Sequence, residues 1–225
     1  FFEQQAALPA GQRISFSVKA MPQFYTYFYA YLFVPPYGNQ LFPQSDLFLR
    51  LPAGNKLARQ EQLKRDFNLP VRKLLLAGEL VPGRYYQTAA GQQLSSIRRL
   101  YPAAATANGW SAYAQQLARE TGYLATDEEI LFLAWIQYRR AAAALTEVRL
   151  QTKQYDYADA LNFLTAENGF SQEDAERILK EITFRPGEKA SYIYGLAAIE
   201  QARTKYAKKM GKKFNLAQFH NLMLQ

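Results

Sequence analysis

The chain has no cysteine and only one histidine, His220, among its 225 residues. Without cysteine it forms no disulfide, offers no thiolate to a metal and has no thiol nucleophile. A single imidazole cannot build an ordinary zinc site, which draws on several side-chain ligands. The neighbours Phe219 and Leu222 place His220 in an apolar helical pattern, which favours a structural role. The composition thus excludes thiol chemistry and a histidine-rich metal site.

Long apolar runs are also missing. The most apolar early stretch, residues 24–34, is far shorter than the roughly 20 residues that a membrane-spanning helix needs. No secretory signal peptide is visible. The chain begins at Phe1 rather than Met, so we expect a processed or partial sequence.

The formal net charge is +8, from 27 Lys and Arg against 19 Asp and Glu, but the charges are dispersed along the chain. No nucleic-acid-binding motif is present, so no nucleic acid partner is expected. The densest basic run is typical of a solvated helix end, with a patch for anionic lipid or polymer as the alternative. Association with a membrane surface is expected only under that alternative. The run consists of Arg203, Lys205, Lys208, Lys209, Lys212 and Lys213.

The length and a hydrophobic content of 49% predict one well-packed domain over residues 1–225. We expect an α+β fold, mainly α, with a β-rich part over residues 1–55 and a helical part over residues 56–225. No stretch rich in Pro, Gly or Ser is long enough to divide the chain into independent domains.

Three segments of the first part have strand character. Apolar Ile14, Phe16 and Val18 alternate with polar residues, which predicts a half-buried strand. Residues 24–34 are apolar on both faces, which predicts a central strand covered on both sides. Residues 46–51 form a third short segment. Their short connections predict a small antiparallel sheet of about three strands.

The remainder predicts about seven helices, delimited by capping and breaking residues. Leu69-Pro70 marks a restart, because proline suits the first helical turn. Thr126 and Glu129 form a capping box that opens a long helix. These seven helices are expected at residues 85–100, 108–120, 126–150, 156–167, 171–182, 189–210 and 216–224.

One segment carries most of the chemical information: Gly78-Glu79-Leu80-Val81-Pro82-Gly83-Arg84-Tyr85-Tyr86-Gln87. Zinc peptidases place His and Glu side by side on a helix, with a second His one or two turns further on, because such residues share a helix face. The histidines hold zinc and the glutamate activates the bound water. Here Glu79 is present without those histidines.

The segment resembles the motif H-E-G-x-P-G-H-H-x-Q of the bacterial domain-of-unknown-function 885 (DUF885) family, a group of zincin-like metallopeptidases. Gly78 stands where the motif has its first His, and Arg84 and Tyr85 stand where it has its His pair. Residues 108–115 are similar to the family's E-G-W-A-L-Y-A-E, with Asn108 in place of the downstream zinc-binding Glu. Residues 140–151 are similar to R-A-A-R-L-V-V-D-T-G-x-H, with Gln151 at the His.

Two further segments follow in the family's order. Residues 186–195 are similar to P-G-Q-A-L-S-Y-K-I-G, and residues 213–220 to F-D-L-x-x-F-H. The resemblance extends over nearly the whole chain and corresponds to the C-terminal half of a typical member. It implies a zincin-like helical bundle and, from the family's relatives, a periplasmic or cell-envelope location.

Every metal-binding or imidazole position that the resemblance implies is replaced in this chain: these positions hold Gly78, Arg84, Tyr85, Asn108 and Gln151. The scaffold positions, such as Pro82, Gly83, Trp110 and Gly195, are kept. The resemblance therefore implies a catalytically inactive member without a bound metal or cofactor. Glu79 is then a catalytic remnant or a structural partner of Arg84, whose guanidinium would repel a divalent cation.

Such a protein is expected to act by binding. The former peptide cleft would be lined by residues near the motif and on later helices: Arg84, Tyr85, Tyr86, Gln151, Tyr192 and Tyr194. Tyr192 has a plain structural interpretation too, as a packed and hydrogen-bonded tyrosine, and Trp110 and Tyr113 are expected in the core. The expected partner is a peptide or a protein.

An assembly with a chain that supplies the missing N-terminal helical half predicts a large exposed apolar surface. Two alternatives remain. The first is a hydrolase in which Glu79 works with another carboxylate or in which a partner chain completes a metal site. The second is a basic module that binds anionic lipid or polymer.

Overall fold

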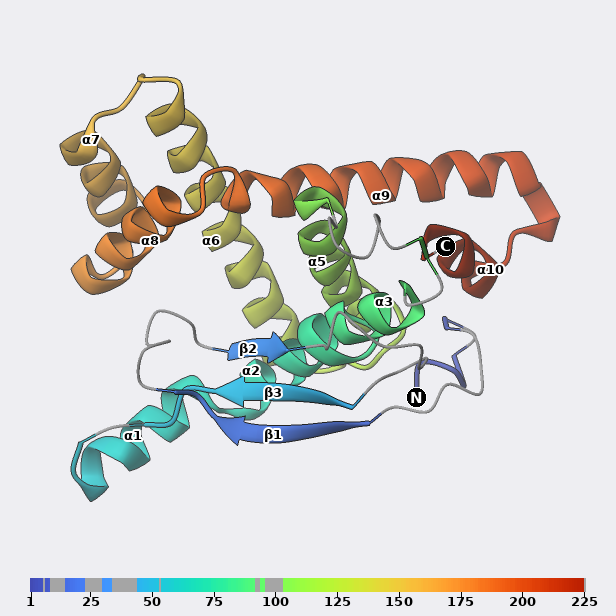
Figure 1. Cartoon of the computed structure of the whole chain (residues 1–225), viewed down its shortest axis with the longest axis horizontal. Helices are drawn as coiled ribbons and strands as arrows, with labels where there is room; N and C mark the ends of the chain where they lie inside the picture. The colour runs from blue at the N-terminus through green and yellow to red at the C-terminus, as the bar shows by residue number, and fades with distance from the viewer. Residues whose placement is uncertain are drawn as a thin grey trace.

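The computed structural model describes residues 1–5, 7–8, 15–22, 30–33, 44–52, 54–91, 94–95 and 103–224. As predicted, the fold is α+β and mainly helical, with one small sheet near the N-terminus (Figure 1). Within the described residues, no helix is both long enough and apolar enough to cross a membrane.

The sheet has three strands, β1 (Phe16–Ala20), β2 (Ala30–Phe33) and β3 (Ser45–Leu49), in the spatial order β1-β3-β2. β2 pairs with β3 antiparallel, but β1 pairs with β3 parallel. The predicted all-antiparallel sheet is therefore wrong. Successive strands alternate in direction, so the first and third point the same way, and the sheet places these two side by side.

Two further strand predictions need correction. β3 is central and β2 lies at an edge, so the apolar segment that contains β2 is not the central strand; its residues 24–29 and 34 lie outside the described residues. β1 is the other edge. Its Phe16 and Val18 remain 40% and 59% exposed, so the predicted half-buried strand is mostly exposed. Leu32 and Leu47, which are paired in the register, are buried.

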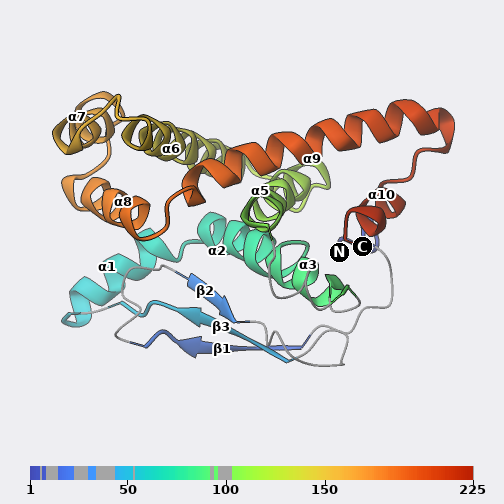
Figure 2. The same cartoon turned by 45° about the horizontal axis from the view of Figure 1, so that its top comes forward.

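The helices cover one side of the sheet, with α2 and α3 nearest to it (Figure 2). The described helices are α1 (Lys56–Asp66), α2 (Leu69–Leu75), α3 (Arg84–Ala90), α5 (Ala104–Glu120), α6 (Asp127–Gln151), α7 (Tyr157–Asn162), α8 (Gln172–Phe184), α9 (Glu188–Met210) and α10 (Leu216–Met223). Short π-helical turns occupy Leu76–Leu80 and Phe163–Glu167, and a 3-10 turn occupies Gly211–Lys213.

Most predicted helix starts are confirmed by their caps. Thr126 Oγ1 accepts a hydrogen bond from the Glu129 amide at 3.3 Å, and Glu129 Oε2 accepts one from the Thr126 amide at 3.3 Å. Glu129 also binds Lys73 Nζ at 2.6 Å, which joins α6 to α2. The predicted helix over residues 85–100 is shorter, since α3 ends at Ala90; residues 96–100 lie outside the described residues.

The buried side chains form two clusters. The larger one surrounds α5 and includes Leu47 of the sheet, Leu74 of α2 and Trp110 of α5. The smaller one lies between the second half of α6 and the α7–α8 segment, with Leu164 and Ile178 inside it. In Figure 1, α7 and α8 accordingly stand beside one end of α6, away from the sheet.

The helices α5 and α9 cross at two glycines. A Cβ on Gly195 would lie 1.8 Å from the carbonyl oxygen of Ala105, and a Cβ on Gly109 would lie 2.4 Å from the carbonyl carbon of Gly195. Both clashes involve backbone atoms, which cannot move aside as a flexible side chain can. The absence of side chains at this crossing brings the α5 and α9 residues around the motif into contact.

Candidate functional site

The motif segment bends sharply between α2 and α3. Gly78 and Glu79 lie in the π-helical turn that continues α2, and Arg84 begins α3. A Cβ on Gly83 would lie 2.0 Å from the Gly78 carbonyl oxygen, so only glycine fits the bend. Trp110 Nε1 donates to the Pro82 carbonyl oxygen at 2.8 Å, which anchors the bend to α5. The retained Pro-Gly and Trp positions thus hold the segment's shape.

Arg84 is at the centre of the site. Its Nη2 donates to Asn108 Oδ1 at 3.0 Å and to the Tyr192 hydroxyl at 2.9 Å, and its Nε lies 3.3 Å from Glu79 Oε2. Burial opposes the positive charge, but Glu79 and Tyr192 outweigh it, and the pKa of Arg84 is raised above its ordinary value. The predicted pairing of Arg84 with Glu79 is confirmed in this geometry.

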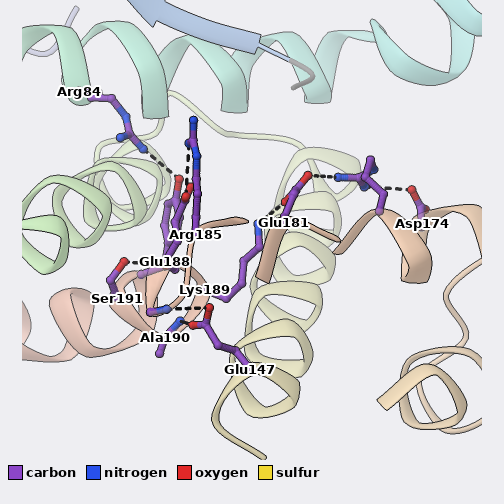
Figure 3. Close-up of polar contacts among 12 residues, drawn as sticks. Arg84, Glu147, Asp174, Glu181, Arg185, Glu188, Lys189, Ala190 and Ser191 are labelled. Atoms are coloured by element: carbon purple, nitrogen blue, oxygen red, sulfur yellow. Dashed lines mark hydrogen bonds and ion pairs between the residues drawn. The ribbon is translucent and has the colours of Figure 1, made fainter. Parts of the chain in front are cut away.

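The contacts continue from Asn108 into α9. Asn108 Nδ2 donates to Ser191 Oγ at 2.7 Å, and Ser191 Oγ donates to the Glu188 carbonyl oxygen at 2.6 Å. Figure 3 shows Glu188 and Ser191 on α9, with Arg84 reaching toward them from α3. The position that holds a glutamate in the family motif therefore serves here as an amide link between α3, α5 and α9.

The start of α9 is fixed by a carboxylate from α6. The buried Glu147 accepts hydrogen bonds from the Gly187 amide at 3.0 Å and the Ala190 amide at 2.8 Å (Figure 3). These are backbone donors at a helix N-terminus, where a negative charge is stabilised. Glu147 thereby sets the position of Ser191 and Tyr192 one turn further along.

A second arginine, Arg140 of α6, reaches the site from the other side. Its guanidinium carbon lies 5.0 Å from the centre of the Tyr192 ring, and its Nη1 donates to Gln115 Oε1 at 2.7 Å. Burial is the largest effect and lowers the pKa of Arg140; Tyr192 and Glu79 act in the opposite direction, and Arg84 contributes a smaller lowering. Tyr192 thus lies between two guanidinium groups.

A buried polar stripe on α5 connects the two arginines. Asn108, Ser111 and Gln115 lie one turn apart on one side of the helix and are 5%, 0% and 6% exposed. Gln115 Nε2 donates to the Leu74 carbonyl oxygen at 3.0 Å. Two buried side-chain atoms of the described residues have no hydrogen-bond partner, Ser111 Oγ and Arg84 Nε, and both belong to this site.

The other predicted cleft residues lie elsewhere. Tyr85 and Tyr86 point into the main core, at 0% and 2% exposed, and the Tyr85 hydroxyl accepts a hydrogen bond from the Ser15 amide at 3.1 Å. Tyr194 is 71% exposed, and it lies on a different side of α9 from Tyr192. Gln151 is exposed at the last turn of α6, about 16 Å along the helix from Arg140.

The residues at the motif do not fit a zinc ion. Gly78 offers no donor, Asn108 offers an amide, and Arg84 brings a positive charge to the side chain of Glu79. A Cβ on Gly78 would lie 2.7 Å from Gln115 Nε2, so a side chain at this position requires Gln115 to shift. Among the described residues, no group of three His, Cys, Asp or Glu side chains is placed to hold a metal.

His220 is a structural residue, as its apolar pattern predicted. It is fully buried, its Nδ1 lies 2.5 Å from the Ala7 carbonyl oxygen, and its Nε2 lies 2.8 Å from the Tyr113 hydroxyl. A carbonyl only accepts, so Nδ1 carries the proton and Nε2 accepts from Tyr113. Burial lowers the pKa of His220 to about 4.

Sequence reasoning missed the roles of Arg140, Ser111, Gln115 and Glu147. For α5 a signal existed: polar residues at 108, 111 and 115 recur with helical spacing inside an otherwise apolar segment. Arg140 was part of a motif match, but its direction depends on how α6 crosses α5 and α9. Nothing local marks Glu147 as a cap for a helix that begins 40 residues later.

The basic run lies at the end of α9. Lys205, Lys208 and Lys209 are exposed and follow the helix to its C-terminus, where cations offset the helix dipole. Arg203 differs, since its Nη1 lies 2.7 Å from Glu120 Oε2 of α5. This arrangement agrees with a solvated helix end.

Comparison with solved structures places the fold beside two larger proteins. A candidate lipoprotein from Colwellia psychrerythraea matches with a TM-score of 0.81 and 21% identity, over 99% of this chain and 37% of its own. A candidate lipoprotein of unknown function from Shewanella oneidensis matches with a TM-score of 0.79 and 21% identity, over 99% of this chain and 40% of its own. This chain thus spans well under half the length of these proteins.

No curated protein matches the chain. The model of one protein family does match, over residues 12–225, which is nearly the whole sequence and includes every segment compared above. The chain belongs to the family described as "Bacterial protein of unknown function (DUF885)".

Proposed function

We propose that this DUF885 protein is a catalytically inactive, metallopeptidase-like protein that acts as a binding or assembly subunit. The observation that carries the proposal is the Arg84 guanidinium, which lies 3.3 Å from Glu79 and bonds Asn108 and Tyr192. In a zinc hydrolase the glutamate must be free to take a proton from metal-bound water. Here the glutamate neutralises an arginine.

The surrounding scaffold supports a retained fold rather than a decaying one. The bend at Gly83, the crossing at Gly109 and Gly195, and the Trp110 anchor each have a steric or hydrogen-bonding reason to persist. The substitutions at the motif, in turn, form a connected set of contacts. A fold kept in this way without metal ligands is suited to binding.

A hydrolysis assay tests the inactive state. The purified chain, with and without added zinc, is incubated with a mixed peptide library, and new termini are counted by mass spectrometry. We expect no cleavage above that of the Glu79→Gln variant. Cleavage that is present in the wild-type chain and abolished by Glu79→Gln would establish a hydrolase and contradict the proposal.

A long apolar stripe on α6 supports the assembly role. Every exposed residue between 131 and 148 is Leu, Ala, Trp, Tyr or Val. The larger ones, Leu131, Trp135, Tyr138, Leu145 and Val148, are 71%, 46%, 51%, 41% and 44% exposed. They fall on one side of the helix and extend over about 26 Å. Uncharged surface of this length is typical of an interface.

The proposed occupant of the α6 stripe is a polypeptide that supplies the rest of a DUF885 fold. The two larger structures contain more than twice the chain that matches here, since the match covers 37% and 40% of them. A helical body of that size would cover the stripe with its own apolar residues. The exposed apolar surface that this assembly requires is present on α6.

Stripe variants test the assembly. Leu131→Gln with Trp135→Gln should lower the binding of an apolar fluorescent dye by the chain, while Leu222→Gln, at a 56% exposed position of α10, should not. Sedimentation should show a monomer at low concentration. A chain that binds no dye, or a stable homodimer that the stripe variant dissolves, would contradict a separate partner chain.

We also propose an exported or envelope-associated location. The support is the description of both larger structures as candidate lipoproteins. Fractionation of the producing cells with an antibody against the chain checks it. Recovery in the cytoplasmic fraction alone would contradict it.

A further inference from the structure

Arg140 has an unusual environment for a half-buried arginine. Among the residues that the structure describes, its guanidinium has no carboxylate partner; it bonds Gln115 Oε1 and stacks on Tyr192. The adjacent Arg139, by contrast, lies 3.0 Å from Asp174 Oδ2. A guanidinium has five N–H donors, and the bond to Gln115 uses one of them.

The guanidinium groups around Tyr192 differ in their partners. Arg84 Nε lies 3.3 Å from Glu79 Oε2. Among the described residues, Arg140 has the Gln115 amide oxygen and the Tyr192 ring as partners and no carboxylate within ion-pair distance. Buried and half-buried charges are normally paired, because an uncompensated one is costly away from water.

The unpaired atoms of the site show the same deficit of acceptors. Arg84 Nε is buried and makes no hydrogen bond that meets ordinary geometry, although Glu79 lies near it. Ser111 Oγ, next to Gly78 and Gln115, is likewise buried and unpaired. Buried polar groups without a partner are rare, and a ligand that binds at the site is one explanation for them.

We propose that the Arg84–Arg140–Tyr192 site binds a monoanionic carboxylate, such as the C-terminus of a peptide. This inference rests on the proposed binding function and names the ligand class for it. Arg140 is one guanidinium without a carboxylate partner, and one carboxylate would pair with it. The free N–H groups of Arg140 form the planar fork that a carboxylate accepts in a bidentate manner.

The site lies near the molecular surface. The side chains of Arg84 and Glu79 are 27% and 21% exposed, and Tyr192 and Arg140 are partly exposed as well. The Tyr192 hydroxyl accepts a hydrogen bond from Arg84, and its ring lies against the Arg140 guanidinium. The two guanidinium groups are thereby preorganised, which lowers the ordering cost of binding.

Acetate is the simplest probe. It is titrated into the wild-type chain at constant ionic strength, with chloride as the replaced ion, while the arginine Nε–Hε signals are followed by NMR. We expect saturable shifts for Arg84 and Arg140 and none for Arg139. A C-terminal free-acid peptide should shift the same signals, and its amide should not.

A pair of matched variants tests whether acetate binds at Arg140. Arg140→Gln should weaken acetate binding about tenfold or more, the usual size for losing a charge-assisted pair. Arg139→Gln removes the same charge from the next residue and should leave binding unchanged. Circular dichroism checks folding; if Arg140→Gln unfolds, Arg140→Lys, which keeps the charge and loses the fork, must still weaken binding.

The absence of a saturable shift in the wild-type chain would overturn the inference. So would a response to inorganic phosphate without one to acetate, or equal binding by Arg140→Gln and Arg139→Gln. These outcomes would leave the inactive-enzyme proposal untouched, since that proposal fails only through peptide cleavage or specific zinc binding.

Discussion

The two faces of α5 differ in what they contact. One face carries Trp110, Tyr113 and Leu117 into the main core, each at 1% exposed or less. The opposite face carries Asn108, Ser111 and Gln115 toward the motif, where they meet Arg84 and Arg140. Both faces are buried, but only on the first is the burial explained by the packing of apolar side chains.

The comparison separates the side chains of α5 that fill the core from those that build the polar site. On the core face, Trp110 bonds the Pro82 carbonyl oxygen and Tyr113 bonds His220. Each of these two side chains combines a large apolar ring with one specific hydrogen bond. On the polar face, Asn108 and Gln115 link the two arginines to α5 through amide hydrogen bonds. The proposed loss of metal ligands concerns this face alone.

The largest effect is expected at the crossing that holds the two faces in place. Gly195→Ala would put a Cβ 1.8 Å from the Ala105 carbonyl oxygen, so α5 and α9 must separate. We expect a loss of about 3 kcal/mol or more in the free energy of unfolding, the upper range for overpacking. Urea denaturation measures it. Ala197→Val, at an exposed site on the same helix, is the control; equal losses would contradict the crossing's role.

Acid should weaken the core face through His220. Its pKa is about 4 when folded against 6.5 as the ordinary value, so the unfolded chain takes up the proton first. Stability is therefore full above pH 6.5 and falls by about 1.4 kcal/mol per pH unit toward pH 4. Urea midpoints between pH 7 and 5 measure this.

The pH dependence caused by the carboxylates Asp46, Glu129 and Asp174 can be distinguished from that of His220. Their pKa values are lowered from 3.8, 4.5 and 3.8, so their own contributions are lost only at more acidic pH. His220→Gln should flatten the profile between pH 6.5 and 5. An unchanged slope in that variant would contradict the assignment to His220.

On the polar face, Asn108→Ala should cost less. It removes an acceptor from Arg84 and a donor from Ser191, each of which keeps another partner. We expect a loss of about 1–2 kcal/mol, the range for one or two hydrogen bonds with a charged member. Thermal or urea unfolding measures it. A loss as large as that of Gly195→Ala would erase the contrast between the faces.

The smallest effect has the opposite sign. Ser111→Ala removes a buried hydroxyl that has no hydrogen-bond partner and places a better helix former in α5. We expect a gain of about 0.5–1 kcal/mol in the free energy of unfolding. Urea unfolding of the chain without added ligand measures it. A clear loss would show that the hydroxyl has a partner after all.

The sequence was informative where structure is decided locally. The capping box at Thr126 and the proline restart at Leu69 predicted helix starts that the fold confirms. The parallel pairing of β1 and β3 was not predicted, because strand order depends on contacts between residues that are distant in sequence. Tyr85, predicted at a cleft, turns into the core because α3 lies against the sheet.

The candidate site was predicted in part. Pairing of Arg84 with Glu79 followed from opposite charges within one short motif, and the structure adds Asn108 and Tyr192 to that pair. Gln151 was placed by motif alignment alone, and it lies near the end of a 25-residue helix, away from Arg140. The direction in which the Arg140 side chain points could not be predicted, because it depends on how α6 packs against α5 and α9, and no local sequence pattern encodes that packing.

Zinc binding by the metal-free chain, followed by titration calorimetry, tests the central claim most directly. If Arg84 has taken the place of the metal ligands, zinc should bind without a defined stoichiometry, and Glu79→Gln should not change the titration. One tightly bound zinc ion per chain that is lost in Glu79→Gln would contradict the claim.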